Sequence, residues 1–527
     1  MTYRSGRSSR SLGVMVGLAL AVAACSSGDA VPREPSSPSS EGAPATTDAP
    51  EDDAAPLSEP ESQTESEPAP APEPEPAEVR SPAAEPLLDA GAGTIQPVAS
   101  APLPDGYSEA EFVIAGDATS YEAVGSLDVD GRWDSTESGT VAPFATRMIV
   151  RTPPAEDFSG VVLVEWMNVT AGSDTTPDWG FLHEMIGREG HAYVAVSAQY
   201  VGVMGDDESF FDGGIIDTRG LPVKDPVRYG SLDHPGDAFS FDIFTQAGVA
   251  ISDADVLDGL EPASVIAMGE SQSAFFMATY ANSIHPLVDL YDGFLVHSRG
   301  GSATRPNGAR SGDDIEFVQI RSDLNAPVLQ YETETDIFGL GFLPARQPDT
   351  ETVRTWEVAG TAHADAYSLF ASGLPRDAAS GSILGCSTPI NDGPQHETLA
   401  AAVHHLVAWV VDGTAPPASP VLGVDGDSFV RDDLGIATGG VRTPVVDAPL
   451  RVLTGEPGPD GGSCFLFGQT IPFDDGVLGS LYDSLGEWSA AAQASADLSV
   501  EAGWLLPEDA ASMLEEGTAL AMSLGLS

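Results

Sequence analysis

From about residue 100 onward, short apolar runs alternate with segments in which apolar residues recur at helical spacing. Apolar runs of this length are typical of buried parallel strands, and the helical segments between them are typical of crossover connections. We expect strands at 111–114, 147–151, 161–169, 192–197, 265–268, 288–296, 326–331 and 353–359, and helices at 180–189, 238–251, 274–281 and 397–411. This order predicts one large α/β domain over residues 96–527, with a mostly parallel central sheet flanked by helices.

Two stretches interrupt this alternation. Residues 200–236 are rich in glycine, aspartate and aromatic residues, and the last hundred residues combine a Pro/Gly-rich part with two weak helical segments. Long irregular stretches inside a compact domain are often functional, so we expect lid-like insertions. We expect 200–236 and the apolar residues 465–467 to wall a pocket, because 299–325 is polar and lacks helical periodicity.

The first 95 residues have a different pattern. Residues 1–24 carry three arginines and then an apolar run, which is typical of a secretory signal and too short for a membrane span. The run ends in small residues before Cys25, which resembles a lipobox and predicts a lipidated cysteine that anchors the chain to a membrane; the alternative is a soluble secreted protein. Residues 25–95 consist mainly of Pro, Glu, Ala and Ser, which predicts a disordered acidic linker. We therefore expect an exported, cell-surface or membrane-anchored bacterial lipoprotein.

Charge and cysteines narrow the choice of partners. The 80 acidic residues against 22 basic ones give a formal charge of −58, which disfavours nucleic acid as a partner. Apart from Cys25 only Cys386 and Cys464 remain, and in an exported chain we expect them to form a disulfide, two buried thiols being the alternative. The Cys and His spacings match no zinc site, and we expect neither a metal nor a cofactor. The oligomeric state cannot be read from the pattern.

The most informative stretch is 263–283, which reads ASVIAMGESQSAFFMATYANS. An apolar strand leads into Gly269-Glu270-Ser271-Gln272-Ser273, and a helical pattern follows. This is the context of a nucleophile elbow, the G-x-S-x-G turn of α/β hydrolases, in which small flanking residues allow strand and helix to pass closely. The motif has glycine where this chain has Ser273, which is a departure.

A serine nucleophile needs a histidine base, and the histidine needs an acid that fixes its tautomer. Along the chain an α/β hydrolase triad runs serine, acid, histidine. Here Asp336 follows a later strand, and His363 follows the next strand in the sequence GTAH. We predict the triad Ser271, Asp336 and His363, with Glu334 as the reserve acid and Glu332 as a further competitor on the same loop.

Other residues are expected around the triad. The backbone N–H groups of Gln272 and Val169 are the predicted oxyanion-hole donors, although the HGGG sequence of lipases is absent near Val169. Further candidates for pocket residues or alternative acids are Glu270, Tyr229, His234 and Glu334. For Tyr229 and His234 the alternative is a packing role.

The chain also resembles a known family. The segments VEWMNVTAG, DPVRYGSLDHPGDAFSFDIFTQAG, GESQSAFFMATYAN, ETETD with ARQPD, AGTAHAD, LFGQTIPF and LYDSLGEW look like those of a large, mostly uncharacterised family of bacterial α/β hydrolase domain proteins. The resemblance covers about residues 100–527. It implies the α/β hydrolase fold and the triad Ser271, Asp336 and His363, and it supplies no substrate.

Together these features predict a surface-tethered serine hydrolase that cleaves small carboxylic esters through an acyl-enzyme on Ser271. The alternatives are an amidase, peptidase or acyltransferase with the same triad, or a non-catalytic binding lipoprotein that keeps the fold. A haloalkane dehalogenase is disfavoured because its nucleophile is an aspartate.

Overall fold

The computed structural model describes residues 79–87, 95–96, 101–206, 217–252, 255–309, 315–371, 379–381, 384–474 and 476–527. The expected signal segment, Cys25 and most of the expected linker lie outside these residues.

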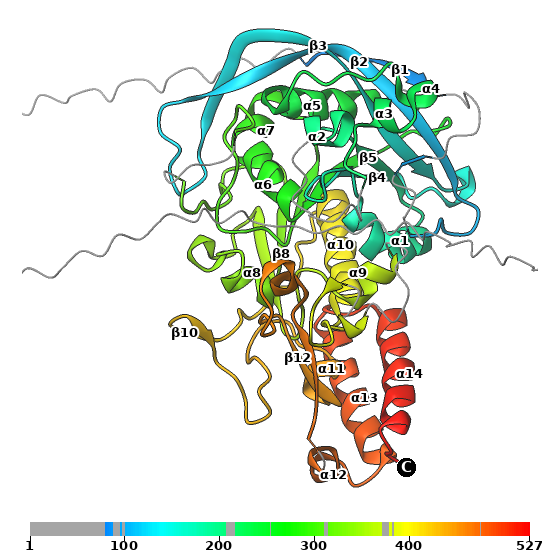
Figure 1. The fold of residues 1–527 in the computed structure, drawn as a ribbon, viewed down its shortest axis with the longest axis vertical. Coiled ribbons are helices and arrows are strands. Elements are labelled where there is room, and N and C mark those ends of the chain that lie inside the picture. Colours follow the sequence, from blue (N-terminus) through cyan, green and yellow to red (C-terminus); the bar gives the residue numbers. More distant parts are fainter. Residues whose placement is uncertain are drawn as a thin grey trace, which may run out of the picture. The chain divides into compact units, whose positions relative to one another are not determined.

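A nine-stranded sheet organises the domain (Figure 1). Its spatial order is β1-β2-β3-β5-β4-β6-β7-β8-β9, with parallel pairing from β5 to β9 and antiparallel pairing among β1, β2, β3 and β5. The strands are β1 Ala83–Pro86, β2 Ser108–Val124, β3 Asp134–Thr152, β4 Val161–Trp166, β5 Ala192–Val196, β6 Ser264–Glu270, β7 Gly293–His297, β8 Val328–Thr333 and β9 Val353–Val358. The predicted mostly parallel sheet is therefore present.

The first strands correct the expected boundaries. Strand β1 lies inside the range expected as linker, so the sheet begins at Ala83 rather than after residue 95. It is an edge strand on β2, a place that tolerates the proline at Pro86, and Arg80 beside it pairs with Glu137 at 3.1 Å. Strands β2 and β3 are also much longer than the short strands expected, because they form one continuous antiparallel pair.

Helices cover both faces of the sheet. The side chains of β4 alternate between two buried clusters: Val162 and Val164 pack with α5 (Ser240–Ala250) and α6 (Gln272–Thr279), and Val161 and Leu163 pack with α1 (Pro177–Glu189) and α10 (Gln395–Asp412). A strand buried on both sides explains the unbroken apolar run from which it was predicted.

Strand β7 begins later than expected. The predicted strand 288–296 overlaps the end of the short helix α7 (His285–Val288), and Asp289 follows with a φ of 45°. The chain therefore completes a helical connection and a turn before it enters the sheet at Gly293.

The C-terminal part lies beyond the parallel end of the sheet (Figure 1), where Val441 forms a bridge to Val358 of β9. It contains a two-stranded sheet of β12 (Arg451–Thr454) and β13 (Gln469–Pro472) and two 17-residue helices, α13 (Leu485–Glu501) and α14 (Pro507–Ser523), which pack on each other. The remaining elements are short: β10 Val424–Asp425, β11 Ser428–Phe429, α2 Tyr200–Met204, α3 Leu221–Lys224, α4 Pro226–Tyr229, α8 Glu334–Phe338, α9 Ala366–Ala371, α11 Pro444–Asp447 and α12 Val477–Leu481.

Candidate active site

Ser271 occupies a strained turn between β6 and α6. Its φ of 57° and ψ of −118° lie in a region that non-glycine residues rarely adopt. A Cβ at Gly269 would lie 3.1 Å from the carbonyl carbon of Ser273, so glycine at 269 relieves a close approach across the turn. With glycine there, the buried Ser273 fits in the position where the motif has its second glycine.

The three residues predicted as a triad lie in one hydrogen-bonded chain. His363 Nε2 is 2.8 Å from Ser271 Oγ, and His363 Nδ1 is 2.7 Å from Asp336 Oδ1. All three are buried, with exposed fractions of 2% for Ser271, 1% for His363 and 0% for Asp336. This arrangement can move a proton from a hydroxyl to an imidazole whose tautomer is fixed by a carboxylate.

Asp336 is positioned by the start of α8. Its second oxygen, Oδ2, accepts hydrogen bonds from the backbone N–H and the hydroxyl of Thr333, both at 2.7 Å. This capping box fixes the carboxylate and leaves Oδ1 directed at His363.

Glu334 lies elsewhere, which corrects its assignment as the reserve acid. Its carboxylate accepts hydrogen bonds from the backbone N–H of Gly360 at 2.7 Å, the backbone N–H of Gly455 at 3.0 Å and the hydroxyl of Thr454 at 3.1 Å. Glu334 therefore ties the end of β8 to the loop after β9 and to β12, and it does not orient His363.

The predicted oxyanion donors lie next to each other. The backbone N–H of Val169 donates to the side-chain oxygen of Gln272 at 3.4 Å, and the Gln272 amide donates to Gln199 at 3.0 Å. Gln272 is the first residue of α6, where backbone N–H groups have no intrahelical acceptor. The two backbone donors thus belong to one small region beside Ser271.

The loop that carries Val169 is held by a buried ionic cluster. Asp174, at the end of this loop, accepts hydrogen bonds from Arg147 at 3.0 Å and from Ser197. Arg147 also binds Glu111 at 2.7 Å, and the hydroxyl of Tyr229 lies 3.1 Å from the same carboxylate. All of these groups are buried or nearly so, so the cluster fixes the position of the loop.

Tyr229 and His234 have these packing roles rather than a place against the triad. Tyr229 is fully buried in the ionic cluster. His234 Nε2 lies 3.0 Å from the carbonyl of Ala198, its Nδ1 accepts from Gly236 N–H, and burial lowers its pKa. Among the described contacts of these two residues, none reaches Ser271 or His363. Residues 207–216 of the expected lid lie outside the described part.

Residues 465–467 do approach His363. The N–H of Ala364, next to His363, donates to the carbonyl of Leu466 at 3.0 Å, and the disulfide Cys386–Cys464 holds this segment in place. The segment 299–309, by contrast, packs on α6, where the hydroxyl of Thr279 donates to the carbonyl of Thr304 at 2.7 Å.

Sequence reasoning did not foresee the buried acids beneath the elbow. Glu165 accepts hydrogen bonds from the first N–H groups of α1, those of Asp178 and Trp179, at 3.1 and 2.9 Å. Asp178 in turn lies 2.7 Å from Nδ1 of His297, whose carbonyl accepts the N–H of Ser271 at 2.9 Å. The signal was a single carboxylate in the apolar run VVLVEW, since a buried charge requires partners.

Glu270 is the one additional acid that reaches the triad among the described residues. Its Oε1 lies 3.3 Å from His363 Nε2, and the residue is 6% exposed. Burial raises its pKa well above the usual range, and the neighbouring Asp178, Asp336 and Glu165 raise it further.

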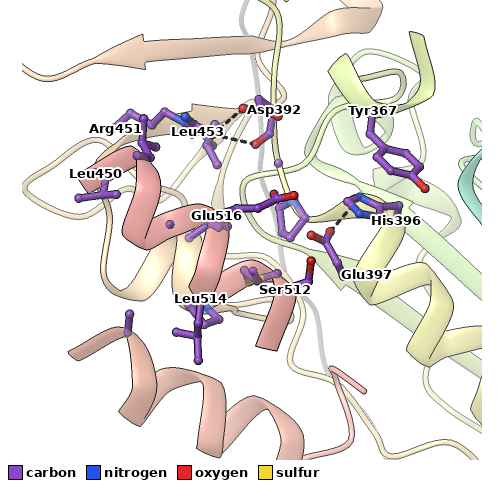
Figure 2. Close-up of a pocket in the computed structure, with 18 of the residues that line it drawn as sticks. Tyr367, Asp392, His396, Glu397, Leu450, Arg451, Leu453, Ser512, Leu514 and Glu516 are labelled. Carbon is purple, nitrogen blue, oxygen red and sulfur yellow. Dashed lines mark hydrogen bonds and ion pairs between the residues drawn. The ribbon is translucent and has the colours of Figure 1, made fainter. Parts of the chain in front are cut away.

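A cavity of about 590 Å³ lies apart from this site, between α10, α13 and α14 (Figure 2). None of Ser271, His363 and Asp336 lines it. Two ion pairs are part of its lining: Asp392 with Arg451 at 2.6 Å and His396 with Glu397 at 3.0 Å. Burial lowers the pKa of His396, but Glu397 and Asp365 outweigh this and raise it to about 9. Three buried polar atoms of the lining, Tyr367 Oη, His396 Nδ1 and Glu397 Oε2, have no hydrogen-bond partner among the described residues.

The described residues contain no group of His, Cys, Asp and Glu side chains arranged to hold a metal ion. Within the same residues, no helix has the length and hydropathy needed to cross a bilayer.

Comparison with known proteins places the chain in a family. Residues 42–515 match the model of the family described as alpha/beta hydrolase domain, and the chain belongs to this family. No curated protein matches.

Solved structures that match part of the chain include an esterase from the fungus Rhizomucor miehei, with 13% identity over 59% of this chain and 87% of that chain and a TM-score of 0.30. Acetyl xylan esterase 1 from Thermoanaerobacterium sp. JW/SL YS485 has 10% identity over 52% and 81% and a TM-score of 0.27. Carboxyl esterase 2 from Tuber melanosporum has 11% identity over 46% and 80%, also with a TM-score of 0.27. The assignment to the family rests on the family model and not on these likenesses.

Proposed function

We propose that this protein is a serine hydrolase that cleaves carboxylic esters through an acyl-enzyme on Ser271. The observation that carries the proposal is the chain of two hydrogen bonds, 2.8 and 2.7 Å long, from Ser271 through His363 to Asp336. A binding protein has no need of a serine in a strained turn joined to this relay.

The proposed reaction has two halves. Ser271 Oγ attacks the ester carbonyl carbon while His363 Nε2 takes the hydroxyl proton, and Asp336 stabilises the imidazolium. The backbone N–H groups of Val169 and Gln272 are the proposed donors to the oxyanion, and Val169 must then exchange its bond to the Gln272 side chain for one to substrate. His363 next protonates the leaving alcohol. Water, activated by the same nitrogen, then hydrolyses the acyl-enzyme and frees the acid.

Turnover of a p-nitrophenyl ester series by wild type and Ser271→Ala tests this function. We expect the variant to lose activity on the order of 10⁶-fold in kcat, as for nucleophile removal in other serine hydrolases. A parallel p-nitroanilide series tests amide cleavage. Ester turnover that survives in Ser271→Ala would exclude the proposed nucleophile, and faster cleavage of the anilides would replace the ester assignment by an amidase.

We also propose that the domain is exported and tethered to the membrane by a lipid on Cys25, which precedes β1 in the chain. The support is the sequence pattern alone: an arginine-containing apolar segment that ends in small residues before a cysteine. Metabolic labelling with an alkynyl fatty acid should mark the wild type and not Cys25→Ser. Equal labelling of both would contradict the anchor.

A further inference from the structure

Glu270 connects three parts of the site. It is the last residue of β6 and directly precedes Ser271. One oxygen, Oε1, lies 3.3 Å from His363 Nε2, the same nitrogen that lies 2.8 Å from Ser271 Oγ. The other oxygen, Oε2, accepts a hydrogen bond from the side-chain amide of Asn168 at 3.1 Å, and Asn168 directly precedes Val169.

The orientation of the Asn168 amide is fixed by its other bonds. Its Nδ2 also donates to the backbone carbonyl of Glu270 at 3.1 Å, and its Oδ1 accepts the N–H of Thr170 at 2.8 Å. A carbonyl can only accept and an N–H can only donate, so the nitrogen must face Glu270. Oε2 is therefore an acceptor, and together with the backbone carbonyl of Glu270 it holds the Asn168 amide from one side.

The surroundings of Glu270 favour its uncharged form. The charged and titratable groups that face it are Glu165 of β4, Asp178 of α1, Asp336 of α8 and His363 after β9. His297 of β7 binds Asp178 and is the next titratable group beyond it. Three of these are carboxyls, and no cationic guanidinium or ammonium group contacts Glu270 among the described residues. An ionised Glu270 would add a further negative charge to a buried acidic group.

We propose that Glu270 acts as an uncharged positioning residue that packs against the Nε2 edge of the His363 imidazole and holds the oxyanion loop through Asn168. The inference rests on the proposed function, because it concerns the same triad. The lone pair of Nε2 stays with the Ser271 hydroxyl, and Asp336 fixes the opposite edge of the ring. No proton passes to or from Glu270 during turnover.

The uncharged state has a consequence for the pH profile. An ionised Glu270 would repel the oxyanion that forms beside Val169 and Gln272, and it would attract the Nε2 proton that His363 must give to the leaving alcohol. We therefore expect kcat/KM to fall by roughly tenfold on the basic side as Glu270 ionises.

Two substitutions at this position separate geometry from charge. In Glu270→Gln the amide oxygen keeps the bond from Asn168, and the side chain keeps its volume beside His363 but cannot ionise. We expect kcat within roughly fivefold of wild type at pH 7 and loss of the basic inflection. In Glu270→Ala the ring loses its support, and we expect kcat to fall roughly 100-fold with little change in KM.

Asp242→Asn is the matched control. Asp242 is another buried acid whose pKa is raised by burial, and it binds Thr119 and Gln246 instead of the triad. This variant should keep the wild-type basic inflection. The isosteric Glu270→Gln keeps the test valid even if circular dichroism shows that Glu270→Ala is misfolded.

The decisive experiment measures ester kcat/KM from pH 5 to pH 10 for wild type, the three variants and Ser271→Ala. A basic inflection in wild type and Asp242→Asn that is absent from Glu270→Gln supports the inference. A Glu270→Gln variant that is as inactive as Glu270→Ala, or that keeps the inflection, overturns it. If wild type shows no basic inflection, Glu270 stays uncharged over the whole range, and the inference then requires Glu270→Gln to match wild type while Glu270→Ala loses kcat. Ser271→Ala separates the two claims, since an active Ser271→Ala would refute the proposed nucleophile whatever the Glu270 variants do.

Discussion

The substitution Asp336→Asn tests the relay at the point where the structure constrains it most. The side-chain amide that this substitution introduces can turn its oxygen either to His363 or to Thr333. Thr333 presents a backbone N–H to Oδ2 at 2.7 Å, and this group can only donate. The amide oxygen must therefore stay on Thr333, which leaves the NH₂ group facing His363 Nδ1 at the 2.7 Å position now held by Oδ1.

This orientation forces the wrong tautomer. Facing a donor, Nδ1 becomes an acceptor and the imidazole proton moves to Nε2, the nitrogen that must take the proton of Ser271. Loss of the triad acid through its tautomer costs about 10⁴ in kcat in serine proteases, or about 5.5 kcal/mol of transition-state stabilisation. We expect a loss of this size in kcat, with KM nearly unchanged because substrate contacts remain.

Glu334→Gln is the matched control, since Glu334 lies two residues away in the same short helix α8. Its carboxylate accepts two backbone N–H groups, and a Gln would bring its NH₂ against one of them. We expect a loss of about 1–3 kcal/mol in the free energy of unfolding and a nearly normal kcat for the folded fraction. Steady-state kinetics on a p-nitrophenyl ester, with urea unfolding of each variant, separates the two effects. A crippled Glu334→Gln beside a nearly normal Asp336→Asn would refute the reasoning.

Two further predictions concern stability. Replacing Cys386 and Cys464 by serine should cost about 4 kcal/mol in unfolding free energy in the chain-entropy model, because the bridge joins residues 78 positions apart; alkylation of both cysteines without prior reduction would contradict the bridge. Burial raises the pKa of Asp365 from 3.8 to about 7, so the folded state retains a proton that the unfolded state releases, and stability falls between pH 4 and pH 7. Asp365→Asn should remove this fall, so that its free energy of unfolding exceeds that of wild type by up to roughly 4 kcal/mol as the pH rises from 4 to 8. A difference in urea unfolding between the two proteins that does not change with pH would exclude this linkage.

Much of the fold followed from local pattern. Strands β4 and β6 are buried on both faces, so their sequences are nearly unbroken apolar runs that can be recognised as strands. The helices between them show apolar residues at helical spacing. The candidate triad could be predicted from the order of serine, acid and histidine along the chain. The ends of parallel strands meet at one edge of the sheet, so they bring together residues that are 92 and 27 positions apart.

What the pattern missed depends on tertiary partners. Strand β1 reads AAEP, a sequence without strand propensity, and it is a strand because β2 offers a free edge. Glu334 and Asp336 could not be separated by spacing, since the choice depends on which donors surround each carboxylate. Tyr229 lies in a sequence stretch that is typical of a pocket wall. Its place in the ionic cluster depends on Glu111 and Arg147, which are distant in the sequence.

The positions of the acids around the elbow also depend on tertiary partners and could not be predicted from the sequence pattern. The contact of Glu270 with His363 depends on the side-chain direction at a strained turn, which no sequence period describes. Glu165 and Asp178 are compatible with burial because helix α1 donates its first N–H groups to Glu165 and His297 pairs with Asp178.

The central claim is that Ser271 is the nucleophile, and covalent labelling tests it most directly. The purified protein is treated with a fluorophosphonate, digested, and the adduct is located by mass spectrometry in wild type, Ser271→Ala and Ser273→Ala. Ser273 is the matched control, a buried serine two residues away whose hydroxyl has no hydrogen-bond partner in the described part of the chain. We expect a single adduct on Ser271, none in Ser271→Ala and full labelling in Ser273→Ala. An adduct on another residue, or undiminished labelling of Ser271→Ala, would contradict the account.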